Sequence, residues 1–275
     1  MNSIKSLLKH FFPGKIYHLL SAIKNRSSYP YSFSTIFKLP ESISDFFVWS
    51  PYARKTYFVA ENVRALIKGE KVKVTHLLKF YSRDGVFLRE DSHSDDDFFS
   101  RIQINGKLNE EHYCSFTHSV QCDEDGDDIF IDKKIKMNRE LVCGQNRGYC
   151  IYYPDSDLSI GSMVHGNFGG ISDQGARLAR QRAMHLYTPA YMFEPHNEYD
   201  LVFNNPTSRK LKLCVFYNST NDFLEHSIEP LGTLSVRIVN YTGTLSFESR
   251  LPIGRPIIFK NPDGKNSSDF DVLHS

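Results

Sequence analysis

The sequence lacks an excess of charge of either sign. Its 275 residues carry 33 Lys and Arg against 32 Asp and Glu, a formal net charge of +1. A chain this close to neutrality has no overall field that would draw it to a phosphate backbone, because such binding needs many basic groups gathered together. We therefore expect no nucleic acid among its partners.

Cysteine is scarce and long apolar runs are missing. The five cysteines are odd in number and form no Cys-x-x-Cys pair, which argues against a disulfide framework and against a zinc knuckle. No run of about 18 apolar residues occurs, so we expect no transmembrane helix.

Recognised catalytic motifs are also missing. The chain contains no Gly-x-Ser-x-Gly, no His-Glu-x-x-His and neither glycine-rich signature of nucleotide-binding loops. We predict no metal and no other cofactor, and these motifs leave open whether the protein is an enzyme.

Aromatic residues are abundant, with 21 Phe and 15 Tyr beside one Trp. Such residues favour strands, and here short apolar runs alternate with turn residues as in antiparallel sheets. The polar run over 91–97 is expected to be a loop. Strands are expected at 45–50, 56–60, 63–67, 72–81, 101–104, 199–203, 210–217, 234–239, 244–248 and 257–260.

One segment of the chain occurs twice. Residues 77–102 match residues 213–238 without a gap at seven of 26 positions, at a constant offset of 136, and Arg101-Ile102 returns as Arg237-Ile238. Unrelated segments of this length should match at about one or two positions. The match predicts an internal duplication, and the two equivalent arginines could each anchor a strand to a carboxylate.

The duplication predicts a mainly β protein with two tandem antiparallel β-sandwich-like units. We place the first unit at 35–140 and the second at 141–275, after a leader and linker over 1–34. Helical periodicity predicts an amphipathic helix within 1–25 and a second helix inserted near 173–186. The first helix either lies on an anionic membrane surface or packs on the protein's own core.

The leader carries a further pattern. It contains Leu7-Leu8-Lys9, Phe12-Pro13, Tyr17, Leu19-Leu20 and Ile23-Lys24-Asn25. It resembles the leaders of many bacterial enzymes encoded in surface-polysaccharide gene clusters, over about a tenth of the chain. The resemblance implies a cytoplasmic protein of glycan assembly, peripheral to the inner membrane face.

The most site-like stretch is 163–181, where a glycine-rich turn joins the predicted basic helix. Glycines let backbone N–H groups approach a ligand, a helix N-terminus favours anions, and arginines add charge-assisted hydrogen bonds. A turn followed by a helix with solvated arginines is the alternative. The candidate ligand-binding residues are His165, Asn167, Gly169, Gly170, Asp173, Arg177 and Arg180.

Three interpretations of function follow. The leading one is a non-catalytic binding or assembly protein that recognises a glycan or a nucleotide-sugar-like anionic ligand. The second is an enzyme of polysaccharide assembly, a transferase or a metal-assisted hydrolase, that uses His165, Asp173 and either His185 or His196. The third is a structural β protein that forms homo-oligomers through its sandwich edges.

Overall fold

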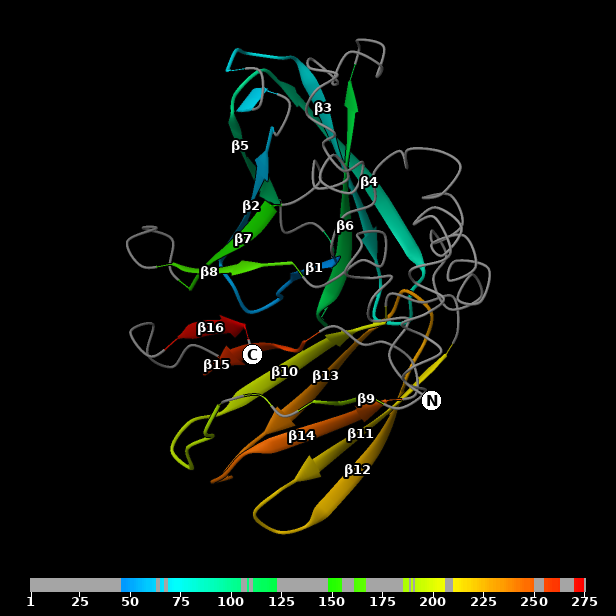
Figure 1. Ribbon diagram of the computed structural model, residues 1–275, viewed down its shortest axis with the longest axis vertical. Helices are drawn as coiled ribbons and strands as arrows, with labels where there is room; N and C mark the ends of the chain where they lie inside the picture. The colour runs from blue at the N-terminus through cyan, green and yellow to red at the C-terminus, as the bar shows by residue number, and fades with distance from the viewer. Residues whose placement is uncertain are drawn as a thin grey trace, which may run out of the picture.

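The fold was analysed in a computed structural model of the chain (Figure 1). Its description covers residues 46–62, 65–66, 69–104, 108, 111–122, 148–154, 161–166, 185–187, 189, 191–205, 210–249, 255–262 and 270–274. The predicted leader helix lies outside this part of the chain, as does most of the predicted helix at 173–186. Among the described residues, no helix has the length and apolar character needed to cross a membrane.

The first unit is a sandwich of two four-stranded antiparallel sheets, ordered β1-β6-β3-β4 and β5-β2-β7-β8. Inward-facing apolar residues alternate with outward-facing ones along β3 and β5, as expected for strands that bury one face. The eight strands that its described residues form are β1 (Phe46–Trp49), β2 (Lys55–Glu61), β3 (Val74–Tyr81), β4 (Phe87–Asp95), β5 (Phe99–Ile104), β6 (Cys114–Cys122), β7 (Gly148–Tyr153) and β8 (Ser162–His165).

The second unit repeats this arrangement with sheets ordered β9-β14-β11-β12 and β13-β10-β15-β16. Its strands are β9 (His185–Tyr187), β10 (Tyr199–Asn204), β11 (Leu211–Tyr217), β12 (Asp222–Ile228), β13 (Thr233–Ile238), β14 (Leu245–Ser249), β15 (Ile257–Lys260) and β16 (Asp271–His274).

Each strand of the first unit therefore has a counterpart at the same place in the second. In each unit the innermost pair of strands is a hairpin, β3–β4 in the first copy and β11–β12 in the second. In the first copy the next pair outward along the chain, β2 with β5, lies in the other sheet, and the pair after it, β1 with β6, lies in the sheet of the hairpin again. This nested pairing is that of a jelly roll. The prediction of two tandem β-sandwich-like units from an internal duplication is confirmed.

The two sandwiches pack directly on each other. The inward face of the β13-β10-β15-β16 sheet, with Leu201 and Ile258, belongs to the core of the second unit. Its outward face, with Val202, Ile257 and Phe259, joins the core of the first unit. Strand β10 is therefore buried on both faces along its whole length, and its sheet closes one end of the first sandwich (Figure 1).

The turn between β3 and β4 fits tightly into the contact between the two units, which we call the seam. Gly85 has a φ of +78°, and a Cβ atom on it would lie 1.8 Å from the carbonyl oxygen of Pro230 in the second unit. Next to it, the backbone N–H of Thr233 donates to the carbonyl of Arg83 at 2.9 Å. A side chain at position 85 would push the units apart.

Three local predictions differ from the structure. The loop expected at 91–97 is wrong for 91–95, because these residues continue β4. An edge strand with both faces near solvent can carry polar residues throughout.

The strand expected at 63–67 is wrong for Ala65 and Leu66, which form a helical turn. Asn62 caps this turn, because its Oδ1 accepts from Ala65 N at 3.1 Å.

The third difference concerns the helix predicted near 173–186. Its last two residues, His185 and Leu186, belong to strand β9, where they pair with Ser249 and Glu248 of β14. The sheets also divide the chain later than the expected division between 140 and 141, because β7 and β8 pair within the first unit.

Candidate functional site

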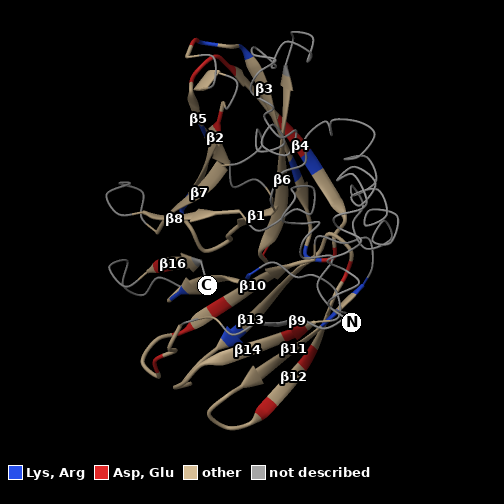
Figure 2. Ribbon diagram, viewed as in Figure 1, with Lys and Arg blue, Asp and Glu red and all other residues tan. Residues whose placement is uncertain are grey.

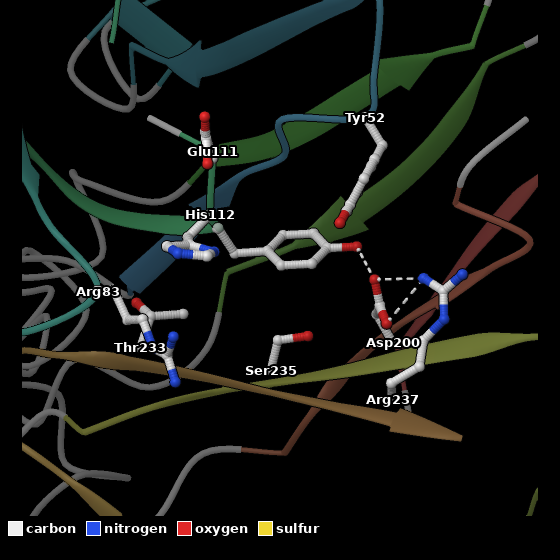
Figure 3. Close-up of a pocket in the computed structure, with 9 residues that line it drawn as sticks. Tyr52, Arg83, Glu111, His112, Asp200, Thr233, Ser235 and Arg237 are labelled. Atoms are coloured by element: carbon white, nitrogen blue, oxygen red, sulfur yellow. Dashed lines mark hydrogen bonds and ion pairs between the residues drawn. The ribbon is translucent and has the colours of Figure 1, made fainter. Parts of the chain in front are cut away.

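The candidate site is a polar pocket of about 340 Å³ at the seam between the two units (Figure 3). Two groups of residues, far apart in the sequence, line it. The first unit contributes Tyr52, Arg83, Glu111, His112 and Tyr113, and the second contributes Asp200, Thr233, Ser235 and Arg237.

Strand alternation places the second group. Residues Tyr199, Leu201 and Phe203 point into the core of the second unit, so Asp200 points to the other side, toward the first unit. Register then sets Arg237 of β13 directly beside Asp200 of β10. Figure 2 shows this as an acidic position on β10 next to a basic one on β13.

The first group comes from one end of the first sandwich. Tyr52 follows β1, Arg83 lies in the β3–β4 turn, and Glu111 and His112 precede β6. Tyr113 is buried because its ring packs against Phe259 of β15, with ring centroids 4.9 Å apart. The pocket therefore exists only where the end of one unit meets the sheet face of the other.

Asp200 forms the floor of the pocket, with a side chain that is only 4% exposed. Both of its carboxylate oxygens accept from Arg237 Nη1 at 3.1 Å, and Oδ2 also accepts from the Tyr113 hydroxyl at 2.8 Å (Figure 3). Arg237 pairs in addition with Glu198. A buried carboxylate needs such partners, because leaving one unpaired costs several kcal/mol, roughly 3 to 5.

The protonation state of Tyr113 follows from its surroundings. Burial, and then the negative charge of Asp200, raise the pKa of Tyr113 well above that of an ordinary tyrosine. The phenol therefore remains protonated at neutral pH, donates to Asp200, and is unsuited to act as a base.

Several polar groups around this floor remain available to a ligand. Arg83, Glu111, His112 and Ser235 are exposed, and no side chain of the described residues bonds the Arg83 guanidinium. Tyr52 is 42% exposed and lies edge-on to Tyr113 at 5.6 Å, which places an aromatic ring at the rim. Converging donors, acceptors and an aromatic rim are typical of sites for small polar molecules.

The sequence-predicted site residues fall elsewhere. His165 ends β8, where it is exposed and lies edge-on to Tyr149 at 6.0 Å. The other six candidates, from Asn167 to Arg180, lie outside the described residues. Of the histidines in the enzyme alternative, His185 lies in β9 and His196 is exposed ahead of β10. Within the described part of the chain, no three His, Cys, Asp or Glu side chains are placed to hold a metal.

The duplicated arginines, Arg101 and Arg237, are one sequence signal that leads to the pocket, although neither was among the predicted ligand-binding residues. The predicted carboxylate partner is confirmed for Arg237, which binds Asp200 and Glu198. It is wrong for Arg101, whose guanidinium lies 4.2 Å from the centroid of the Tyr57 ring and donates to the Tyr153 hydroxyl at 3.1 Å. The alternating acids of Glu198-x-Asp200 at the start of a strand could have pointed to this pairing.

A second polar constellation lies inside the first sandwich. His76 on β3 is fully buried, with Nδ1 2.9 Å from His118 Nε2 and Nε2 2.9 Å from Ser100 Oγ. Ser100 donates its only hydroxyl proton to Asp95 at 2.7 Å, so His76 Nε2 must be the donor to Ser100 and Nδ1 the acceptor from His118. His93 extends this chain to the surface through Asp95 at 2.9 Å.

This chain of hydrogen bonds has the composition of a nucleophile with its base, but not the geometry. A serine nucleophile must give its proton to the histidine and must be reachable by substrate. Ser100 instead gives its proton to Asp95 and is 1% exposed. The chain therefore ties the two sheets together, since His76 and Ser100 come from opposite sheets.

Comparisons with known proteins add little to this geometry. No family model matches the chain, and no curated protein matches it. Among solved structures, procruciferin, an 11S globulin from Brassica napus, is similar with a TM-score of 0.23 and 7% identity, over 90% of this chain and 81% of that one. A likeness at this level supports no argument about fold or function.

Proposed function

We propose that the protein is a non-catalytic binding protein that holds a small anionic sugar, or the end of an acidic glycan, in the pocket between its two units. The observation that carries the proposal is the Asp200, Arg237 and Tyr113 cluster at the pocket floor, held rigidly by hydrogen bonds of 2.8 to 3.1 Å. A floor organised before binding lowers the entropic cost of association.

The chemistry around the floor suits a hydroxylated molecule with one acidic group. Sugar hydroxyls need donors and acceptors close together, and the exposed side chains of Glu111, His112 and Ser235 offer both kinds. Arg83 is the group suited to a carboxylate or phosphate, because a guanidinium can bind either with two parallel hydrogen bonds. The exposed ring of Tyr52 can cover one face of a sugar.

The hydrogen bonds among Asp200, Arg237 and Tyr113 favour a binding role over a catalytic one. Asp200 is saturated by Arg237 and Tyr113, and Tyr113 keeps its proton, so neither is a poised acid or base. The leader resemblance adds the setting of bacterial surface-polysaccharide assembly. There, residues 1–25 would hold the protein on the cytoplasmic face of the inner membrane, which binding to anionic vesicles and its loss on deletion of 1–25 would test.

Calorimetry with glucuronate, glucose and inorganic phosphate tests the site. The full chain should bind glucuronate more tightly than glucose, and Arg83→Ala should weaken glucuronate at least about tenfold with little effect on glucose. The control is Arg101→Ala, which removes an arginine from the first unit outside the pocket.

Two results would contradict the proposal. One is binding of none of these molecules by the wild-type protein. The other is glucuronate binding that survives Arg83→Ala but is lost in the Arg177→Ala, Arg180→Ala double variant, which would move the site to the glycine-rich stretch predicted from sequence.

A further inference from the structure

A second surface lies on the outward face of the β5-β2-β7-β8 sheet, which we name the first outer face. It carries Tyr57, Phe99, Arg101, Ile151, Tyr153 and Met163. Their neighbours along each strand, such as Phe58 and Cys150, point into the core. Met163 is 58% and Phe99 52% exposed, so large apolar groups face solvent here.

The duplication shows what such a face does in this fold. The counterpart sheet of the second unit, β13-β10-β15-β16, turns the equivalent face toward the first unit and buries Val202, Ile257 and Phe259 there. The covered copy is an interface within the chain. The first outer face is the same surface in the other copy, where the described residues leave Phe99 and Met163 more than half exposed.

The residues of the first outer face are those of a protein contact. Tyr, Phe, Met and Arg are enriched in protein interfaces, whereas Lys, Glu and Asp are depleted. Strands β7 and β8 contain no Lys, Arg, Asp or Glu, as Figure 2 shows. Arg101 is held against the ring of Tyr57 and bonded to Tyr153, so the surface is ordered before any partner arrives.

Charge placement on β2 favours a second copy of this chain as the partner. Its outward row begins at Lys55, passes Tyr57 and Val59, and ends at Glu61, so a basic and an acidic residue lie at opposite ends of the row and the Arg101 guanidinium covers the Tyr57 ring between them. When two such sheets stack with their β2 strands antiparallel, Lys55 of each copy comes to face Glu61 of the other. A two-fold contact requires this kind of self-complementary surface.

We infer that the first outer face is the contact surface of a symmetric homodimer, in which two chains stack these sheets face to face. The contact is separate from the ligand pocket, which lies at the seam between the units. Its four short strands give a modest area, so the dimer should dissociate on dilution and weaken at high salt.

Sedimentation of the full chain over a wide range of concentration tests the dimer. Wild-type protein should be dimeric at the upper end, and Met163→Glu should raise the dissociation constant at least about tenfold by burying a charge in the contact. Met192→Glu is the matched control, because Met192 is 61% exposed but lies outside this face, and it should dimerise as wild type does.

Charge reversal tests the orientation. Lys55→Glu and Glu61→Lys should each weaken the dimer, and the double variant should recover it, because the opposite charges face each other again. Wild-type protein that stays monomeric would overturn the inference. A dimer unaffected by Met163→Glu, or a monomer that binds an oligosaccharide through this face, would also overturn it.

Discussion

Lowering the pH from neutral toward about 4 should destabilise the first sandwich through His76. Burial lowers the pKa of His76 from 6.5 to about 4, with the nearby charge of His93 acting in the same direction and Asp95 opposing both. His118 and Ser100 complete its surroundings, and neither supplies a negative charge. A protonated His76 would carry a buried charge and would turn a second donor toward His118.

The direction and size of the effect follow from linkage. His76 binds its proton more weakly in the folded state than in the unfolded state, so its contribution is complete above pH 6.5 and is lost as pH falls toward 4. A tenfold change in proton affinity is worth about 1.4 kcal/mol, so full protonation should remove about 3 kcal/mol from the free energy of unfolding.

Urea denaturation at a series of pH values measures this loss directly. His76→Gln removes the titrating group, so its free energy of unfolding should be lower at neutral pH but should fall less steeply than wild type between 6.5 and 4. His196→Gln is the control, because that residue is exposed and lies outside this chain of hydrogen bonds. Parallel profiles for wild type and His76→Gln would refute the assignment.

Two further comparisons use the duplication and the turns as internal controls. Gly85→Ala should cost about 3 kcal/mol, from its positive φ and from the clash with Pro230, while Gly69→Ala, with a positive φ but open space, should cost about 1 kcal/mol in thermal unfolding. Arg237→Ala should cost about 3 kcal/mol in urea because it strands a buried carboxylate, whereas Arg101→Ala should cost less than about 1 kcal/mol.

The architecture could be predicted because its signal is spread along the chain. Matched pairs such as Phe80-Tyr81 and Phe216-Tyr217 fall in equivalent strands β3 and β11, and the strands expected at 56–60 and 199–203 are confirmed as β2 and β10. Strand β4 was missed because an edge strand shows no alternation of apolar and polar residues. Hydrogen bonding to β3, which leaves no trace in composition, makes it a strand.

The pocket could not be predicted, because no local spacing encodes it. Arg83 and Arg237 are brought together by the packing of an end of one unit on a face of the other, and each looks like an ordinary surface residue in its own segment. The glycine-rich stretch at 163–181 has a local composition that favours an anion site, so the sequence-based prediction fell there instead. The repeated arginine at 101 and 237 and the alternating acids Glu198-x-Asp200 are the local signals that connect the sequence to the site.

The two copies of the repeated arginine, Arg101 and Arg237, have different surroundings, and only the surroundings of Arg237 include a pocket. On the first outer face, Arg101 has aromatic neighbours and a solvent-facing strand. On the equivalent face of the β13-β10-β15-β16 sheet, Arg237 binds the buried carboxylate of Asp200 and lies against the end of the first unit. A ligand that touches Arg83 and Arg237 together contacts both units, so it binds only while they are packed. Binding of such a ligand therefore stabilises the packing of the two units against each other. The Gly85→Ala variant strains this contact, so it should bind the ligand more weakly although every side chain that lines the pocket is retained.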